Sequence, residues 1–352
     1  MSIRQLTQNA AAIGALTAAV AACGGSSSPP GTASSRATTG ATNANATEQS
    51  GSIVFRRFLK ENQSQGAIFT INPDGTDERV VSKPGSGFSD DFPDYAADGS
   101  LIAFQRCREA GAGLCRLFVV RPDGTGLHAV GGCHSLASQC PDASYPAVAP
   151  NGRQIAFVRK LGRILEDQFE HQGIYRMRTD GSHLRRVTLP AARTAEDENP
   201  NWSSDGRQIV FVRQNLTAEP VGRQALFVVR ADGSRLRRIT PWNMDAGDGP
   251  VWSPDDSRIL FRSPARDDFL NSNLYTIRPD GTGLRQITDV APTTRLYSSS
   301  FSPDGTSIAF GMTGVAEAAD VFTMGTDGAG LKPVTRTPLH DSAPDWGTST
   351  IS

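Results

Sequence analysis

The sequence predicts an all-β protein whose body is a six-bladed β-propeller of four-stranded blades. Two observations predict this fold. Two short strand-and-turn units alternate along the chain from residue 51 onward, and the last copy of one unit is split between the two ends of the chain. The composition agrees, because 38% apolar and 20% charged residues with Gly 35 and Pro 22 are typical of a globular chain with many turns.

Residues 1–22 have the features of a signal peptide. Arg4 is the basic residue of the first segment, and residues 10–22 form an apolar run too short to span a bilayer core of roughly 30 Å. The run ends Val20-Ala21-Ala22-Cys23, which resembles the lipobox of bacterial lipoproteins. This resemblance implies cleavage before Cys23 and acylation of its thiol, which would tether the chain to a membrane. The alternative is an ordinary secretory signal with an incidental cysteine.

The next segment, residues 23–50, is a polar spacer. After the cysteine it consists almost entirely of Gly, Ser, Thr, Ala, Asn, Pro and Gln, and its charged residues are Arg36 and Glu48. Such a composition is typical of a flexible linker. We therefore divide the chain into a signal peptide (1–22), a lipidated cysteine with its linker (23–50) and a propeller (51–352).

The first repeated unit is an alternating apolar run followed by Asp-Gly and then by Leu-x-x-apolar. In such a turn Gly accepts a positive φ and Asp bonds its own backbone, so each copy predicts two strands joined by a tight turn. The turn aspartates are expected to be structural. They are Asp74, Asp123, Asp180, Asp232, Asp280 and Asp327.

The second unit begins with an aromatic or apolar residue, continues as Ser-Pro-Asp-Gly or a variant, and ends in apolar-x-Phe. Complete copies begin at Tyr95, Val148, Trp202, Trp252 and Phe301. The sixth copy is divided, with Pro344-Asp345-Trp346 as its first half and Ile53-Val54-Phe55 as its second. This division predicts that the first and last strands pair, which closes the ring and leaves no large open edge.

Together the two units resemble the TolB-type propeller repeat. The resemblance rests on Trp-Ser-Pro-Asp-Gly-x-x-Ile-x-Phe paired with Leu-Tyr-x-x-x-x-Asp-Gly-x-x-Leu-x-x-Ile-Thr, and it extends over about residues 51–346. It implies an envelope protein, in the periplasm or at the cell surface, that binds other envelope proteins.

Four cysteines remain beyond Cys23, in two close pairs. We expect the disulfides Cys107–Cys115 and Cys133–Cys140, which fit an oxidising compartment. Each would close a short loop and contribute roughly 2.5 kcal/mol. The alternative for the second pair is a zinc site that includes His134, but its spacing lacks the Cys-x-x-Cys signature.

Strand order places the two tight turns of each blade on one face of the propeller and the remaining connections on the other. The connections that lead to the innermost strands are rich in acids, which we expect to surround the mouth of the central channel. These groups could hold a calcium ion or a basic protein segment, or they could cap strand ends. They are Asp90, Asp91, Asp142, Glu196, Asp197, Glu198, Asp245, Asp248, Arg295, Tyr297, His340 and Asp341.

The sequence contains no nucleophile elbow, no His-Glu-x-x-His and no glycine-rich phosphate loop, so we expect no catalytic residue, no metal centre and no cofactor other than calcium. A net charge of −1 argues against nucleic acid as a partner. The prediction is a monomeric, lipid-anchored scaffold for envelope proteins of unknown identity, and not an enzyme. The alternative is a propeller that binds calcium or a glycan, or a lyase-like enzyme at the channel mouth.

Overall fold

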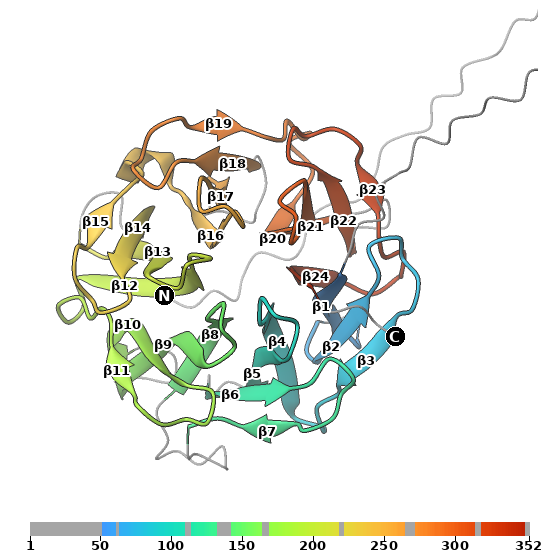
Figure 1. Cartoon of the computed structure of the whole chain (residues 1–352), viewed down its shortest axis with the longest axis horizontal. Helices are drawn as coiled ribbons and strands as arrows, with labels where there is room; N and C mark the ends of the chain where they lie inside the picture. Colours follow the sequence, from blue (N-terminus) through green and yellow to red (C-terminus); the bar gives the residue numbers. More distant parts are fainter. Residues whose placement is uncertain are drawn as a thin grey trace, which may run out of the picture. The chain divides into compact units, whose positions relative to one another are not determined.

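Short alternating apolar runs between tight turns form strands throughout, as the sequence predicts. The computed structural model describes residues 51–60, 63–109, 114–131, 142–163, 169–217, 222–264, 272–313 and 318–348. Over these ranges the strands form six four-stranded antiparallel sheets, arranged as the blades of a propeller (Figure 1). The predicted fold is therefore confirmed.

Within each blade the strands follow one another from the central channel outward. Blade 1 contains β24 (Asp341–Gly347), β1 (Ser52–Phe58), β2 (Gly66–Ile71) and β3 (Arg79–Ser82). Blade 2 contains β4 (Phe88–Tyr95), β5 (Ile102–Arg108), β6 (Cys115–Val120) and β7 (His128–Ala129). Blade 3 contains β8 (Asp142–Val148), β9 (Gln154–Arg163), β10 (Phe169–Arg178) and β11 (Arg185–Arg186).

The other three blades repeat the same order. Blade 4 contains β12 (Ala195–Trp202), β13 (Gln208–Asn215), β14 (Gln224–Arg230) and β15 (Arg237–Arg238). Blade 5 contains β16 (Gly247–Trp252), β17 (Ile259–Ser263), β18 (Asn273–Ile277) and β19 (Arg285–Gln286). Blade 6 contains β20 (Leu296–Phe301), β21 (Ser307–Thr313), β22 (Ala319–Gly325) and β23 (Lys332–Pro333).

Blade 1 is completed by both ends of the propeller. Strand β24 supplies the innermost strand and pairs antiparallel with β1, so that Ser52 faces Gly347 and Ile53 faces Trp346. This is the closure that the split repeat predicts, because it satisfies the edges that an open ring would leave.

Five blades have two tight turns on one side of the ring, which we call the turn face, and blade 1 has one there because its first two strands come from the two ends of the propeller. The turn after β14 is typical: Gly233 has a φ of +88°, and the Asp232 carboxylate accepts a hydrogen bond of 2.8 Å from the Ser234 amide. A Cβ on Gly233 would meet the Val187 carbonyl oxygen at 2.8 Å, so glycine is required there. The opposite side, which we call the loop face, carries the loops between second and third strands and the connections between blades.

The core lies between neighbouring blades. The apolar residues of one sheet pack against those of the next, as where Ala156 and Val158 of blade 3 meet Ile209 and Phe211 of blade 4. Trp202, Trp252 and Trp346 recur at one blade position, are 5–6% exposed and belong to clusters of this kind. Among the described residues the helical element is the 3-10 turn η1 (Trp242–Met244), and no helix in these ranges could span a bilayer.

The innermost strands carry a repeated bulge at mid-length. In five of them a residue with positive φ precedes a proline at the point where the register with the second strand shifts. A bulge of this kind re-aims the side chains on either side of it. The five bulge residues line one cavity in the central channel, and they are Phe92, Tyr145, Asn199, Gly249 and Ala343.

Candidate binding site at the central channel

Three of the carboxylates predicted for the channel mouth lie inside the blades instead. Asp90, Asp197 and Asp341 are fully buried, with 0% exposure. Each accepts a hydrogen bond at 2.6–2.7 Å from the Nε of an arginine on the second strand of its own blade. The pairs are Asp90–Arg106, Asp197–Arg213 and Asp341–Arg57.

The arginines of these pairs are held by aromatic rings. The Arg213 guanidinium lies 4.8 Å from the ring centroid of Phe227 and 5.6 Å from that of Phe211. Burial raises the pKa of Asp197, and the hydrogen bonds from Arg213 and Thr188 act in the opposite direction. A buried charge that is fully paired in this way holds strands together and is not available to a ligand.

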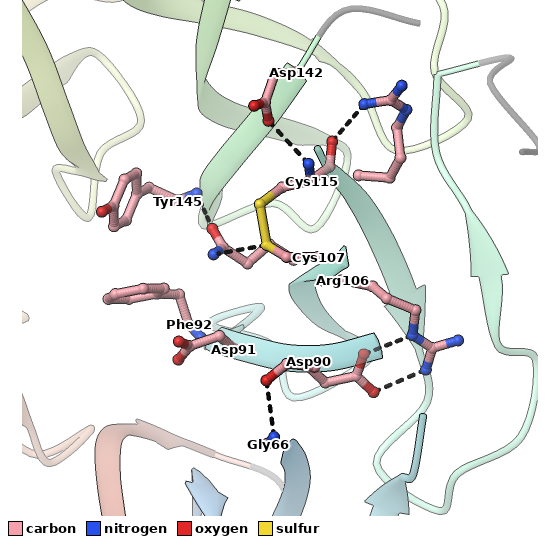
Figure 2. Close-up of a disulfide and its surroundings, with 12 residues drawn as sticks. Gly66, Asp90, Asp91, Phe92, Arg106, Cys107, Cys115, Asp142 and Tyr145 are labelled. Atoms are coloured by element: carbon pink, nitrogen blue, oxygen red, sulfur yellow. Dashed lines mark hydrogen bonds and ion pairs between the residues drawn. A yellow bond between two sulfur atoms is a disulfide. The ribbon is translucent and has the colours of Figure 1, made fainter. Parts of the chain in front are cut away.

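Two further predicted residues cap strands. Asp142 accepts a 3.0 Å hydrogen bond from the Cys115 amide, which Figure 2 shows, and Asp245 accepts one of 2.9 Å from the Gln224 amide. This is the capping arrangement that the sequence left open for these acids.

The residues that do face the channel lie just ahead of the bulge. Asp91 forms an ion pair of 2.5 Å with Arg56, and Asp248 forms one of 2.7 Å with Arg262. Glu198 accepts a 2.8 Å hydrogen bond from the Gln172 amide group and forms no ion pair within the described ranges. Burial raises the pKa of Glu198. Successive side chains of an innermost strand alternate between the blade interior and the channel. Asp90 and Asp91 accordingly point to opposite sides of β4 in Figure 2.

An aromatic pair stands among these carboxylates. The rings of Phe92 and Tyr145 meet edge to face at 4.6 Å and lie on the same side of the strands in Figure 2. Burial, followed by the negative charges of Glu198, Asp91 and Asp248, raises the pKa of Tyr145. Tyr145 therefore lies in the negative potential of these carboxylates and lines a cavity of 80 Å³.

The remaining side of this mouth is cationic and aromatic. Tyr297 meets His340 edge to face at 4.9 Å, and Arg295 is exposed at the rim. Burial and the nearby Arg56 lower the pKa of His340 to about 4, so it is neutral at physiological pH. Glu196 lies half-buried in β12, and burial raises its pKa. The mouth is therefore acidic on the side of Glu198 and basic on the side of Arg295.

The predicted disulfide Cys107–Cys115 is present, with an S–S distance of 2.01 Å, and it joins β5 to β6 at the loop face (Figure 2). Gln105 connects it to the channel. Its side chain donates to the Cys107 sulfur at 3.4 Å and accepts a 2.9 Å hydrogen bond from the Tyr145 amide. The disulfide thus supports the strand position of the channel tyrosine.

Several sequence predictions fall outside the described residues. These are the lipidated Cys23, the second disulfide between Cys133 and Cys140, and the alternative zinc site with His134. Within the ranges that the structure describes, no three His, Cys, Asp or Glu side chains are grouped closely enough to hold a metal ion. These ranges therefore add nothing in favour of calcium.

Comparison with known proteins shows which solved structures share this architecture. No protein-family model matches the chain. The structure of TolB from Acinetobacter baumannii superposes with a TM-score of 0.64 at 14% identity, covering 85% of this chain and 67% of that one. A putative TolB from Agrobacterium tumefaciens gives 0.56 at 19% identity, covering 81% and 88%. The chain has the TolB-type propeller fold.

The same comparison corrects the expectation that this TolB-type propeller is not an enzyme. A segment of 121 residues is 28% identical to the uncharacterized peptidase YuxL of Bacillus subtilis, covering 33% of this chain and 16% of the peptidase. The oligogalacturonate lyase of Vibrio parahaemolyticus superposes with a TM-score of 0.51 at 12% identity, covering 77% of this chain and 72% of that one. Enzymes therefore occur among the relatives of this chain, and the missing motifs do not exclude catalysis.

The TolB-type propeller also has a channel site that the sequence did not reveal. Asp94 and Asp345 lie one residue before the core aromatic of their strands and line a 210 Å³ cavity toward the turn face. Asp345 accepts a 2.7 Å hydrogen bond from the Tyr95 amide of the next blade, and Asp94 accepts one of 2.6 Å from the Val148 amide. Burial and the charge of Asp345 raise the pKa of Asp94 well above its usual range. The signal in the sequence was an acid immediately before the aromatic residue that begins the second repeated unit, at Asp94 and Asp345.

Proposed function

We propose that this chain is an exported, lipid-anchored TolB-type propeller that binds a basic segment of an envelope protein at the loop-face mouth of its channel. In this proposal residues 1–22 direct export, Cys23 carries the lipid, and residues 23–50 link it to the propeller of residues 51–352. The resemblance of the repeats to those of the TolB family supports the envelope location.

The observation that carries the proposal is that the negative charge of Glu198 acts on Tyr145, whose ring packs against Phe92 at the channel mouth. A lysine or arginine that entered the mouth would meet the carboxylate of Glu198, which forms no ion pair within the described ranges, and the aromatic pair of Tyr145 and Phe92. Cations bind favourably to carboxylates and to aromatic faces in partly desolvated sites. Asp91 and Asp248 add negative potential but are already paired with arginines, so Glu198 is the group that a partner would neutralise.

The test is photo-crosslinking in cells with a photoreactive aromatic residue in place of Tyr297, at the rim. We expect one abundant envelope-protein adduct, and we expect Glu198→Gln to reduce its yield about tenfold, as the loss of roughly 1.4 kcal/mol of binding would. The Gln side chain retains an acceptor for Gln172, so the fold should survive, which a thermal melt checks. The matched control places the same probe at Ser234 on the turn face. An adduct whose yield is unaffected by Glu198→Gln would contradict the proposal.

A second candidate is binding or conversion of a small ligand at the turn-face end of the channel. It is favoured by the 210 Å³ cavity, by the paired carboxyls Asp94 and Asp345, and by the enzymes among the relatives. A carboxyl with a raised pKa can serve as a proton donor near neutral pH. Titration with calcium and with neutral and acidic oligosaccharides should then raise the Tm of the protein and leave that of Asp94→Asn unchanged. Flat titrations for the unsubstituted chain would exclude it.

A further inference from the structure

The turn face carries an arginine-rich groove that lies outside the channel. It has a volume of 840 Å³ and separates blade 3 from blade 4. Five arginines line it, from the third strand of blade 3 and from both turns and the outer strand of blade 4. They are Arg176, Arg207, Arg230, Arg235 and Arg237. Such a density of guanidinium groups stands out in a chain whose net charge is −1.

Most of the positive charge in this arginine groove is unneutralised. The guanidinium groups of Arg230 and Arg235 form no hydrogen bond or ion pair within the described ranges, and Arg207 is 84% exposed, with its Nε 3.9 Å from Asp205. The two acids of the groove, Asp205 and Asp232, have oxygens that accept hydrogen bonds inside their own turns. The groove therefore presents guanidinium donors to solvent.

Arg176 and Arg237 are positioned by backbone oxygens rather than by acids. The Arg176 Nε donates a 2.9 Å hydrogen bond to the Ala231 carbonyl, and Arg237 donates to the Pro279 carbonyl. Hydrogen bonds to carbonyl oxygens orient the guanidinium planes and do not neutralise their positive charge. Planar guanidinium forks match the oxygens of phosphate groups in two-point contacts.

The repeat architecture does not require these arginines. The equivalent groove between blades 5 and 6 has a volume of 430 Å³ and is lined by two arginines and two aspartates. By alignment of the repeats, threonine, glycine or lysine occupies the five positions there: Thr276, Thr306, Gly325, Gly330 and Lys332. The repeat therefore does not require arginine at these five positions.

The chain enters and leaves the propeller on this same face. Ser52 pairs with Gly347 at the turn-face end of blade 1, and the Thr348 hydroxyl donates to the Ala97 carbonyl in the first turn of blade 2. The segment that precedes residue 51 therefore joins the body at the turn face. In the proposed function, residues 23–50 link this face to the lipid anchor.

We propose that the arginine groove binds the phosphate groups of anionic phospholipids, so that the turn face lies against the membrane that holds the lipid anchor. The orientation rests on the proposed anchor, whereas the groove itself can be tested without it. Cationic side chains held near an anionic leaflet gain from its surface potential, and a tether raises their effective concentration there. The loop face, with the channel mouth, then points away from the membrane.

The test uses the full chain with Cys23→Ser, which cannot be acylated at that position, and measures cosedimentation with vesicles. We expect binding to phosphatidylcholine vesicles that contain phosphatidylglycerol, loss of binding at high salt, and no binding to phosphatidylcholine alone. Arg207→Thr with Arg235→Gly introduces the residues of the blade 6 groove and should weaken binding about tenfold. Glycine also suits the positive φ of Arg235, so the fold should be preserved.

The matched control removes the same charge elsewhere on the turn face, by Arg258→Gln with Arg285→Gln in the groove between blades 5 and 6. Equal losses in both double variants would show a diffuse electrostatic effect and overturn the groove proposal. Binding of inorganic phosphate or polyphosphate, measured calorimetrically, without binding to vesicles would also overturn it, because the phosphate source would then be soluble. If the protein binds neither vesicles nor soluble phosphate, the groove proposal is also wrong.

These outcomes are independent of the partner test. If the crosslinked adduct at the channel mouth forms and vesicle binding is absent, the membrane-facing role fails and the proposed function stands. If vesicle binding depends on the groove and no adduct forms, the membrane-facing role stands and the proposed partner binding fails.

Discussion

The pKa values of aspartates on the turn face and of aspartates in the innermost strands are shifted in opposite directions. In the Asp-Gly turns the carboxylate is exposed, and hydrogen bonds from the side chain and amide two residues on lower its pKa, as for Asp123 and Asp232. In the innermost strands burial raises the pKa of Asp94 and Asp197. The position of the aspartate therefore decides the direction of the pKa shift. Hydrogen bonds within an exposed turn favour the charged carboxylate, whereas burial in an innermost strand disfavours it.

The largest effect should follow from breaking a buried pair. Asp197→Ala leaves Arg213 without its carboxylate, and we expect a loss of about 3–5 kcal/mol in the free energy of unfolding, measured by urea denaturation. Replacing both residues, by Asp197→Leu with Arg213→Met, should recover part of the loss, because no unpaired charge then remains. A single-variant loss below about 1 kcal/mol would contradict a paired interior charge at this position.

His340 extends the comparison to a base, because burial lowers the pKa of a histidine whereas it raises the pKa of an aspartate. Its pKa is lowered to about 4, so the folded protein keeps it neutral while the unfolded chain, with a pKa near 6.5, takes up a proton. Stability from this residue is present above pH 6.5 and is lost as the pH falls toward 4, with a slope approaching about 1.4 kcal/mol per pH unit.

The measurement is the difference in unfolding free energy between the unsubstituted chain and His340→Gln across that range. The difference should shrink or reverse as the pH falls from 6.5 to 4. A difference that does not depend on pH would show that the folded and unfolded states take up the proton equally, which contradicts a lowered pKa.

Asp94 should show the acid counterpart of this behaviour. Because its pKa is raised in the fold, the folded state holds a proton that the unfolded state has released, and stability falls as the pH rises from about 4 through the folded value. Asp94→Asn keeps an acceptor for the Val148 amide and removes this dependence. Its Tm should therefore exceed that of the unsubstituted chain at neutral pH and converge with it in acid. Channel solvent reaches Asp94, so the effect should be smaller than for His340.

The smallest effect should come from a turn aspartate. Asp232→Asn retains an oxygen that can accept from the Ser234 amide, and the side chain is exposed, so the Tm should remain within the error of a thermal melt. Gly233→Ala in the same turn is the contrast, since its Cβ would meet the Val187 carbonyl oxygen at 2.8 Å. A clear loss in Asp232→Asn would remove the distinction between the two sets of aspartates.

The fold could be predicted because its information is local and repeated. Alternating apolar runs and Asp-Gly turns specify hairpins, and the divided copy at Trp346 and Ile53 specifies closure. The disulfide between Cys107 and Cys115 followed from their spacing across one loop.

The channel site could be predicted only as a band of acids, because the register within each strand decides which side chain faces the channel. Asp90 and Asp91 are neighbours in sequence, yet one lies in an ion pair inside the blade and the other in the channel. The bulge at Phe92 changes the alternation and brings Asp94 to the cavity beyond it. The arginine groove escaped notice because its members come from separate segments of two blades, and the repeats place them together only in three dimensions.

Closure of blade 1 has a consequence for the order in which the protein can be assembled. Strand β1 is among the first parts of the propeller to be synthesised, but its partner β24 is the last. Until β24 arrives, β1 presents an unpaired edge on the channel side, and the apolar cluster between blades 6 and 1 lacks Trp346. The ring therefore cannot close before residues 341–347 have been synthesised, and a product that ends before residue 341 lacks the innermost strand of blade 1.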